Sequence, residues 1–356
     1  MRPAGGAASL PGAMPQGLFC HAPGEVRLQS YDLAPLAPGE VRLLVDFAAP
    51  KHGTLFHAMG GESPFATRTF SRQRLFVPRD QPDPGLVGQW IGNIGVGHVS
   101  EVGAGVTKWR VGDRAWTYGG IRETLERGED DLWPAPDGLS DEAAVCIDPG
   151  HFALGAVRDA RVSPGDRVVV TGLGAIGLLV VQLLVRGGCD GVVAVDTVPA
   201  RRALAERFGA TWTLDPRTTE VGAFTREQWG DGADLAIEAS GSYQALAGAI
   251  RSVGQCGRVV ALGFYCGPGT PLELGAEAFH NRVDLLMSLP DWGNPPRDQR
   301  WSVPRIKRTL VDWFMTGRLR TDGIVDPIVP LDEAAREFTS AFHGRSAGVK
   351  LGVRLR

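Results

Sequence analysis

The sequence has few cysteines and no arrangement of them that would cross-link a fold. Its 356 residues include five cysteines, which are widely spaced and contain no CxxC pair. The odd total and the spacing argue against a disulfide framework and against a four-cysteine zinc lobe, and they favour a reducing cytosol. We therefore expect a cytoplasmic protein.

Long apolar runs and clusters of like charge are also missing. No stretch reaches the roughly 18 uninterrupted apolar residues of a membrane-spanning helix. Lys and Arg total 37 against 40 Asp and Glu, and the basic residues form no long run. Because nucleic-acid-binding proteins concentrate basic charge, we expect neither a nucleic acid nor a membrane as partner, but a small molecule. Residues 1–15 lack the apolar core of a signal peptide, and we expect them to be a disordered lead.

The order of apolar segments predicts an α/β protein of two domains. The chain is longer than a single hydrophobic core usually supports. Up to about residue 150, short apolar runs alternate with Gly and Pro, which is typical of a compact β-rich domain. From residue 151, strand patterns alternate with helix patterns, which predicts a doubly wound parallel sheet.

A glycine-rich turn lies between the first predicted strand and helix of that sheet, in "DRVVVTGLGAIGLLVVQLL". In a GxGxxG turn the first glycine permits the tight bend, the second lets a pyrophosphate approach the backbone, and the third lets helix and strand pack closely. The helix N-terminus then offers free N–H groups to the phosphates. The predicted cofactor-binding turn consists of Gly172, Leu173, Gly174, Ala175, Ile176 and Gly177.

An acidic residue, Asp196, closes the second predicted strand at about the 20-residue distance from the turn where such folds bind a ribose 2′-hydroxyl. A carboxylate there would repel a 2′-phosphate, so the sequence favours NAD over NADP. The alternative is a plain packing turn followed by an aspartate that caps a helix. Arg201 could also touch the ribose, or it could be a solvated helix residue.

Several stretches together resemble the medium-chain dehydrogenases of the alcohol and polyol dehydrogenase superfamily, over nearly the whole chain. They are "EVGAGVTKWRVGDRAW", "SPGDRVVVTGLGAIG", "GRVVALGF" and the closing stretch that begins "LVDWFMTGRLRTDG". The resemblance implies a GroES-like catalytic domain made of residues 16–150 and 291–356, with a Rossmann NAD-binding domain, residues 151–290, inserted between them. It also implies hydride transfer, a homodimer or homotetramer, and a role for Lys350, in the closing strand, near the cofactor pyrophosphate.

The resemblance places unusual residues where zinc-dependent members carry their metal ligands. His52 takes the place of a cysteine, Asn93 lies in "GNI" where those members have a GHE motif, and Ile147 or Asp148 takes the third place. Because a catalytic zinc usually needs three protein ligands, the resemblance implies a branch without zinc. A metal site would require His52, Asp148 and a third group such as His151 to converge.

The stretch "KHGTLFH" carries the residues that the resemblance assigns to proton transfer. In members with a proton relay, a Ser or Thr contacts the substrate hydroxyl and a histidine three residues later passes the proton towards solvent; Thr54 and His57 match. An imidazole pKa near 6.5 suits a general base. The alternatives are a turn hydroxyl and a surface histidine. His52 could orient the substrate, act as the base, or only pack.

Four further residues complete the predicted site. Asn93 could hydrogen-bond a polyol or a ketone, and Trp90 is either a wall of the pocket or part of the core. Asp148 and His151 form either a second acid/base pair or a helix N-terminal cap with a neighbouring histidine.

The leading hypothesis is a zinc-independent, NAD-dependent dehydrogenase that interconverts a secondary alcohol of a polyol, sugar or cyclitol derivative and its ketone. The first alternative is a zinc-free quinone or enoyl reductase, although most of those prefer NADPH and Asp196 counts against it. The second is a non-catalytic NAD-binding protein.

Overall fold

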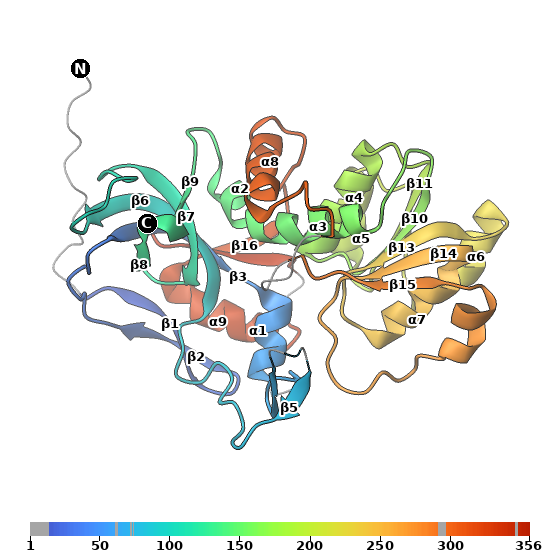
Figure 1. The fold of residues 1–356 in the computed structure, drawn as a ribbon, viewed down its shortest axis with the longest axis horizontal. Coiled ribbons are helices and arrows are strands. Elements are labelled where there is room, and N and C mark those ends of the chain that lie inside the picture. Colours follow the sequence, from blue (N-terminus) through green and yellow to red (C-terminus); the bar gives the residue numbers. More distant parts are fainter. Residues whose placement is uncertain (1–13, 61–62, 72, 74, 291–296, 346–347) are drawn as a thin grey trace. The chain divides into compact units, whose positions relative to one another are not determined.

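The computed structural model describes residues 14–60, 63–71, 73, 75–290, 297–345 and 348–356. The chain forms two compact units, the first made of Met1–Val145 with Val325–Arg356 and the second of Cys146–Ile324 (Figure 1). Most of the expected lead, residues 1–15, lies outside the described residues, and the first strand begins at Gln16. No helix among the described residues is both long enough and apolar enough to cross a membrane.

The second unit extends further towards the C-terminus than the expected boundary at residue 290. Helix α8 (Val303–Met315) packs on helix α3 (Ile147–Asp159), and Gly150 on α3 leaves space that the Leu310 side chain nearly fills. This helix pair holds the segment before residue 325 within the second unit. The boundary therefore follows helix packing, which the sequence pattern did not reveal.

The first unit is built around a mixed seven-stranded sheet of order β16-β17-β3-β6-β7-β9, with β8 also paired to β3. Strand β3 is almost entirely buried because it has neighbours on both sides, and its core residues pack with Phe338. Residue 97 must be glycine where β6 pairs with β3, because a Cβ there would lie 1.9 Å from the Leu44 carbonyl oxygen. The strands are β3 (Glu40–Pro50), β6 (Gly92–Val102), β7 (Arg114–Gly120), β8 (Thr124–Gly128), β9 (Trp133–Pro134), β16 (Val325–Pro330) and β17 (Lys350–Arg354).

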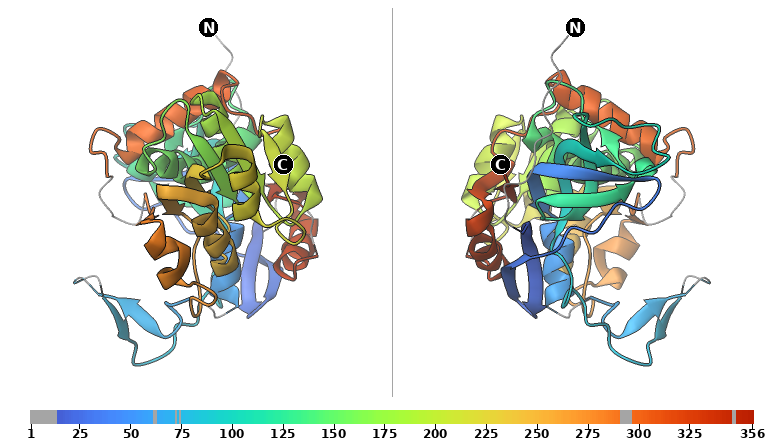
Figure 2. Two further views of the ribbon diagram at one scale, coloured as in Figure 1. Left: turned by 90° about the vertical axis from the view of Figure 1, so that its right-hand side faces the viewer. Right: turned by 90° about the vertical axis from the view of Figure 1, so that its left-hand side faces the viewer.

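Smaller elements surround this sheet. Two hairpins form separate two-stranded sheets. Strand β1 of the first also bridges to Trp90 and Arg122, and the second, β4–β5, projects from the rest of the unit (Figure 2). The hairpin strands are β1 (Gln16–Ala22), β2 (Glu25–Ser30), β4 (Arg68–Phe70) and β5 (Phe76–Pro78). The helical segments are α1 (His52–Met59), η1 (Glu129–Asp131), α2 (Asp141–Val145) and α9 (Leu331–Phe342).

The second unit is a six-stranded, fully parallel sheet of order β12-β11-β10-β13-β14-β15. Helices cover both faces, with α4 and α5 on one side and α6 and α7 on the other (Figure 1). Burial on both faces explains the continuous apolar runs in these strands. The strands are β10 (Arg167–Thr171), β11 (Gly191–Val195), β12 (Trp212–Leu214), β13 (Ala233–Glu238), β14 (Val253–Ala261) and β15 (Asp284–Met287). The remaining helices are α4 (Ala175–Arg186), α5 (Pro199–Arg207), α6 (Val221–Trp229), α7 (Tyr243–Ser252) and η2 (Leu274–Ala278).

The predicted fold class is confirmed: a doubly wound parallel sheet accompanies a separate, β-rich unit. The strand order reverses between β10 and β13. In open α/β sheets, ligands bind outside the carboxyl ends of the strands at such a reversal. The glycine-rich turn follows β10, at this end of the sheet.

Candidate active site

The three glycines of the turn differ in backbone conformation and in the space around them. Gly172 has a φ of +86°, and a Cβ on it would lie 2.6 Å from the backbone nitrogen of Ser240. A Cβ on Gly177 would lie 1.9 Å from the carbonyl oxygen of Gly172, so helix α4 can approach the turn only with glycine there. Gly174 is the N-cap residue of α4 and has open space beside it. This is the division of roles expected of a dinucleotide-binding turn.

Asp196 lies directly beside that turn. It follows β11, is only 9% exposed, and its Oδ2 accepts a hydrogen bond of 2.7 Å from the backbone N–H of Leu173. Its Oδ1 accepts one of 2.8 Å from the N–H of Val198. Each carboxylate oxygen has a second lone pair, so the group can still accept a hydrogen bond from a ribose hydroxyl. Arg201 lies in the first turn of α5, and Ala175 and Ile176 lie in the first turn of α4.

Glu238 is a buried acid at the carboxyl end of the parallel sheet, close to the glycine-rich turn. Sequence reasoning did not identify it. It is the last residue of β13, opposite Thr171 of β10, and is fully buried. It accepts hydrogen bonds from the N–H of Ser240 at 2.6 Å, from the N–H of Gly241 at 3.1 Å and from the hydroxyl of Tyr265. Burial raises the pKa of Glu238. These hydrogen bonds hold the turn after β13 against Gly172. The sequence signal that could have identified Glu238 is an acidic residue at the end of an apolar strand, in "LAIEASG".

In the first unit, the predicted relay residues lie on helix α1. The helix starts at His52, soon after β3 ends at Pro50. Thr54 and His57 are both partly buried, and residues three apart share a helix face. Thr54 therefore belongs to a helix and not to the turn that was its alternative. His52 stacks on Phe56, with ring centroids 5.3 Å apart.

Asn93 and Lys350 both lie next to Pro50, the last residue of β3, just before this helix. Asn93 pairs with Pro50 in the β3–β6 register. Lys350 is 4% exposed, and its Nζ donates a hydrogen bond of 2.8 Å to the Pro50 carbonyl oxygen. The Nδ2 of Asn93 is buried, and no acceptor in the described part of the chain bonds to it. A buried donor without an acceptor costs about 1–3 kcal/mol, so this amide is a strong candidate for binding a ligand oxygen.

Trp90 packs in an aromatic cluster near the start of β6. Its ring lies 5.1 Å from the rings of Phe19 and Tyr31, and the guanidinium of Arg122 lies 5.0 Å from its centroid. Arg122 also lies 4.1 Å above the Tyr31 ring. These contacts give Trp90 a packing role, whereas its role as a pocket wall stays a prediction.

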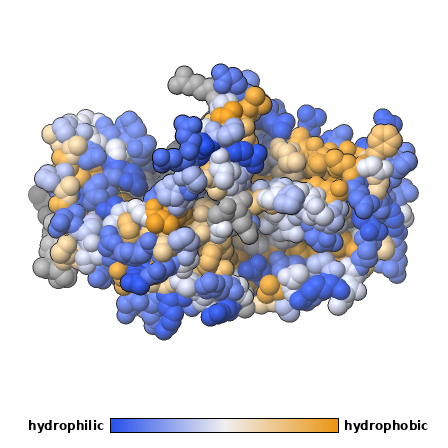
Figure 3. Space-filling model, turned by 90° about the horizontal axis from the view of Figure 1, so that it is seen from below, coloured by the Kyte–Doolittle hydropathy of each residue, from blue (hydrophilic) through white to orange (hydrophobic). Residues whose placement is uncertain are grey.

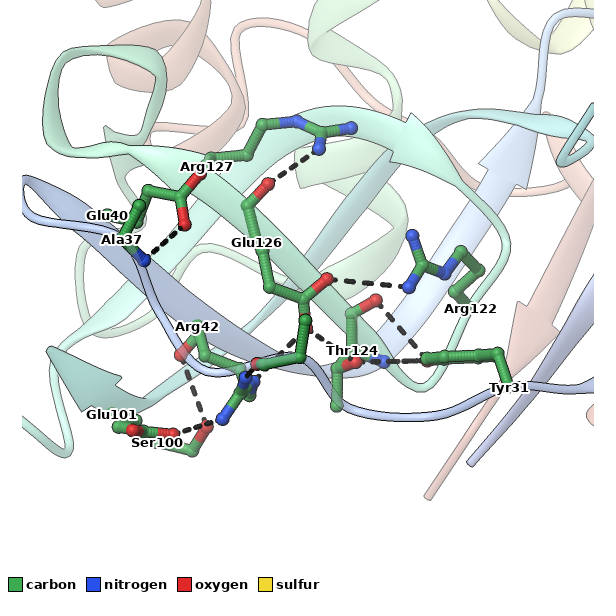
Figure 4. Close-up of polar contacts among 11 residues, drawn as sticks. Tyr31, Ala37, Glu40, Arg42, Ser100, Glu101, Arg122, Thr124, Glu126 and Arg127 are labelled. Carbon is green, nitrogen blue, oxygen red and sulfur yellow. Dashed lines mark hydrogen bonds and ion pairs between the residues drawn. The ribbon is translucent and has the colours of Figure 1, made fainter. Parts of the chain in front are cut away.

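Arg122 and Tyr31 of this cluster also belong to a polar network (Figure 4). The Glu126 carboxylate accepts hydrogen bonds from Arg122 at 3.4 Å, from Arg42 at 3.1 Å and from the Thr124 hydroxyl at 3.0 Å. The backbone N–H of Thr124 donates to the Tyr31 hydroxyl at 2.9 Å. The network ties β8 to β3 and to the segment after β2.

Asp148 and His151 lie on α3, in the second unit, whereas α1 belongs to the first. Both are buried, with 3% and 0% exposure. The N-cap residue of α3 is Cys146, and Asp148 lies inside the first turn, so the interpretation of Asp148 as the cap is wrong. Their three-residue spacing places the two side chains on one helix face. Their role as an acid/base pair stays a prediction.

Comparisons with known proteins agree with this geometry. A family model described as "Zinc-binding dehydrogenase" matches residues 175–289. The D-guloside 3-dehydrogenase of Escherichia coli is 37% identical over 345 residues, which cover 94% of this chain and 99% of that protein. The chain belongs to the medium-chain dehydrogenases, in the alcohol and polyol dehydrogenase family. It is an oxidoreductase that acts on CH–OH groups.

More distant members of this dehydrogenase family show the same architecture over almost the full length. The (R,R)-butanediol dehydrogenase of Bacillus subtilis is 29% identical over 365 residues, covering 94% of this chain and 98% of that protein. The crystal structure of the 2R,3R-butanediol dehydrogenase from Bacillus subtilis superposes with a TM-score of 0.77 at 24% identity, covering 96% of this chain and 100% of that one. The resemblance stated from the sequence is therefore confirmed at the level of the family.

The family description names zinc, and the side chains of this dehydrogenase can be tested against it. Zinc in proteins is bound by Cys, His, Asp or Glu, and a catalytic site needs three such ligands. Across the described parts of the chain, no group of three of these side chains could hold a metal ion. In the first unit, the two places that the resemblance assigns to ligands hold His52 and Asn93. These donors do not fit the zinc centre that the family description names.

Proposed function

We propose that this dehydrogenase uses NAD to oxidise a secondary alcohol of a polar substrate, such as a polyol, sugar or cyclitol derivative, or reduces the corresponding ketone, and that it does so without zinc. The observation that carries the proposal is the buried Asn93 amide donor, which lies beside the start of the helix that carries Thr54 and His57. A substrate with several oxygens would supply the missing acceptor. The relative at 37% identity is named for a D-guloside, a sugar derivative.

NAD would be held by the glycine-rich turn and Asp196. The N–H groups in the first turn of α4 would bind the pyrophosphate, and the Asp196 carboxylate would accept a hydrogen bond from a ribose hydroxyl. When bound, NAD supplies the acceptor for the hydride. The carboxylate at this position supports NAD over NADP, because a 2′-phosphate would meet a like charge.

The proton of the alcohol would leave through Thr54 and His57. The Thr54 hydroxyl can accept a proton from the substrate hydroxyl while it passes its own to the imidazole one helical turn later. His57 is partly exposed, so it can release the proton to water. Asn93 would hold a second oxygen of the substrate and fix its orientation.

We also propose that the protein assembles as a homodimer or homotetramer through strand β15. This strand ends the parallel sheet and carries the exposed apolar side chains of Leu285 and Met287, at 38% and 55% exposure, and Leu289 follows just beyond it at 48%. Hydrophobic surface exposed among polar side chains is visible in Figure 3. A hydrophobic edge strand is a template for pairing with another chain. Light scattering on the wild type and on a Leu285→Lys variant tests this, since only the wild type should form the oligomer.

The test of the catalytic proposal is the initial rate of NAD reduction over a panel of secondary alcohols, polyols, sugars and cyclitols, with protein stripped by a strong chelator. Turnover that survives the chelator is expected. Turnover lost and then restored by zinc would contradict zinc independence. NADH oxidation with enones but not ketones would indicate an enoyl reductase, and tight NADH binding without turnover would indicate a non-catalytic protein.

A further inference from the structure

A second aspartate lies beside the predicted ribose-binding acid. Asp196 follows β11 and Asp215 follows β12, and the last residues of these strands, Val195 and Leu214, pair in parallel register. Both aspartates therefore lie at the carboxyl ends of neighbouring parallel strands. Nothing in the glycine-rich motif predicts the second acid.

Asp215 binds two arginines. Its Oδ1 accepts hydrogen bonds from the Nε of Arg217 at 2.9 Å and from the backbone N–H of the same residue at 3.0 Å. Its Oδ2 accepts from a terminal nitrogen of Arg217 at 2.5 Å and from one of Arg202 at 3.3 Å. The Asp215 side chain is only 15% exposed. Hydrogen bonding to Arg217 holds the pKa of Asp215 well below its usual range, so the carboxylate stays charged at neutral pH.

The same two arginines also contact the turn that carries Asp196. Arg202 donates to the carbonyl oxygen of Asp196 at 2.7 Å, and Arg217 donates to that of Thr197 at 2.7 Å. Both guanidinium groups therefore contact the backbone of Asp196, the acid that would bind the ribose, or of the residue that follows it. In the structure, these contacts and Asp215 determine where the two cations point.

We propose that Asp215 is a specificity residue that keeps Arg202 and Arg217 from binding the 2′-phosphate of NADP. This inference rests on the proposed dinucleotide site. A planar guanidinium fits a phosphate with two parallel hydrogen bonds, and an arginine near this position is how dinucleotide folds accept a 2′-phosphate. With Asp215 present, two carboxylates balance two arginines. Without it, one carboxylate faces two arginines and the site gains a net positive charge.

The experiment compares the binding of two probes, 5′-AMP and 2′,5′-ADP, to the wild type and to Asp215→Asn by calorimetry at low ionic strength. They differ only in the phosphate at the 2′ position. For the variant we expect the Kd of 2′,5′-ADP to fall at least about tenfold and that of 5′-AMP to change less than about threefold, because only the former meets the released arginines. The gain should shrink as salt is added, because the new attraction is partly solvent-exposed.

Two further variants sharpen the test. Asp215→Asn combined with Arg217→Ala should return the affinity for 2′,5′-ADP towards that of the wild type. Asp190→Asn is the matched control: it removes an exposed carboxylate paired with Arg167 at 3.8 Å, at the opposite end of β11, and should change neither Kd. If Asp215→Asn does not fold by circular dichroism, Asp215→Ser carries the same expectation.

An equal loss of affinity for both probes would show that Asp215 only supports the turn, and an unchanged ratio of the two Kd values would overturn the proposal as well. Failure of the dinucleotide site itself has a different signature: the wild type would then bind neither 5′-AMP nor NADH. The two ideas can therefore fail separately.

Discussion

The two units build their candidate sites in different ways. In the second unit the site is backbone: a turn in which Gly172 and Gly177 are required by a nitrogen and a carbonyl oxygen within 3 Å of where a Cβ would lie. In the first unit it consists of side chains, those of Thr54, His57, Asn93 and Lys350, around the end of β3. A backbone site tolerates almost no change, whereas side chains on one scaffold can change their chemistry while the fold persists.

The largest effect should come from breaking the backbone site. Gly177→Val places carbon atoms on the Gly172 carbonyl, so we expect dinucleotide binding to be lost and the second unit to be destabilised by roughly 2–3 kcal/mol. Fluorescence titration with NADH and chemical denaturation measure the two effects. The control is Gly248→Ala on α7, where a Cβ meets no atom within 4 Å. Near-normal NADH affinity in Gly177→Val would contradict this account of the turn.

Changing the side-chain site should affect turnover but not cofactor binding. In His57→Ala and Thr54→Val we expect kcat to fall about 100-fold or more, as for loss of a general base, with the Kd of NADH nearly unchanged. Stopped-flow rates and NADH titration measure the two quantities. Thr54→Ser, which keeps the hydroxyl, should retain most of the activity. Unchanged turnover in both variants would move attention to His52, Asp148 and His151.

Lys350 tests whether the side chains of the first unit also hold its fold together. In Lys350→Met the Pro50 carbonyl loses its partner, which should cost about 1–3 kcal/mol of stability. Hydrogen exchange at β3 and β17 amides measures this loss. Arg354→Met, at an exposed position of the same strand, is the control. A weaker affinity for NADH in Lys350→Met alone would support the predicted contact with the pyrophosphate.

The smallest expected effect is a pH dependence from Glu238. Burial raises its pKa above the ordinary 4.5, so the folded protein holds this proton more tightly than the unfolded chain. The resulting stability is fully present below pH 4.5 and is lost as pH rises through the folded-state pKa. From pH 4 to 8, the wild type should therefore lose stability relative to Glu238→Gln.

Denaturation midpoints of the two proteins across that range measure the Glu238 effect. Glu227→Gln, at an exposed position on α6, controls for the change in formal charge. A constant difference between the wild type and Glu238→Gln at every pH would show that the pKa of this carboxyl is the same in the folded and unfolded states.

Some features followed from the sequence because their causes are local. The GxGxxG spacing predicted the turn, and in the structure Gly172 has a positive φ, Gly177 lies against the Gly172 carbonyl, and Asp196 accepts a hydrogen bond from the Leu173 N–H. The parallel sheet and the separate β-rich unit followed from apolar periodicity. A left-handed φ or a strand–turn–helix sequence depends on a few adjacent residues, so a short stretch carries the information.

Other features depended on contacts between distant segments. Helix α8 joins the second unit because it packs on α3, and Lys350 bonds to a carbonyl 300 residues earlier in the chain. Asp215 lies beside Asp196 only because β11 and β12 pair in one register. By itself, the sequence determined the family, the cofactor turn and the candidate relay residues. Tertiary structure alone decided which charges neighbour Asp196 and that the amide donor of Asn93 is buried without an acceptor among the described residues. The reason is that strand register and helix packing choose among many partners that no local pattern distinguishes.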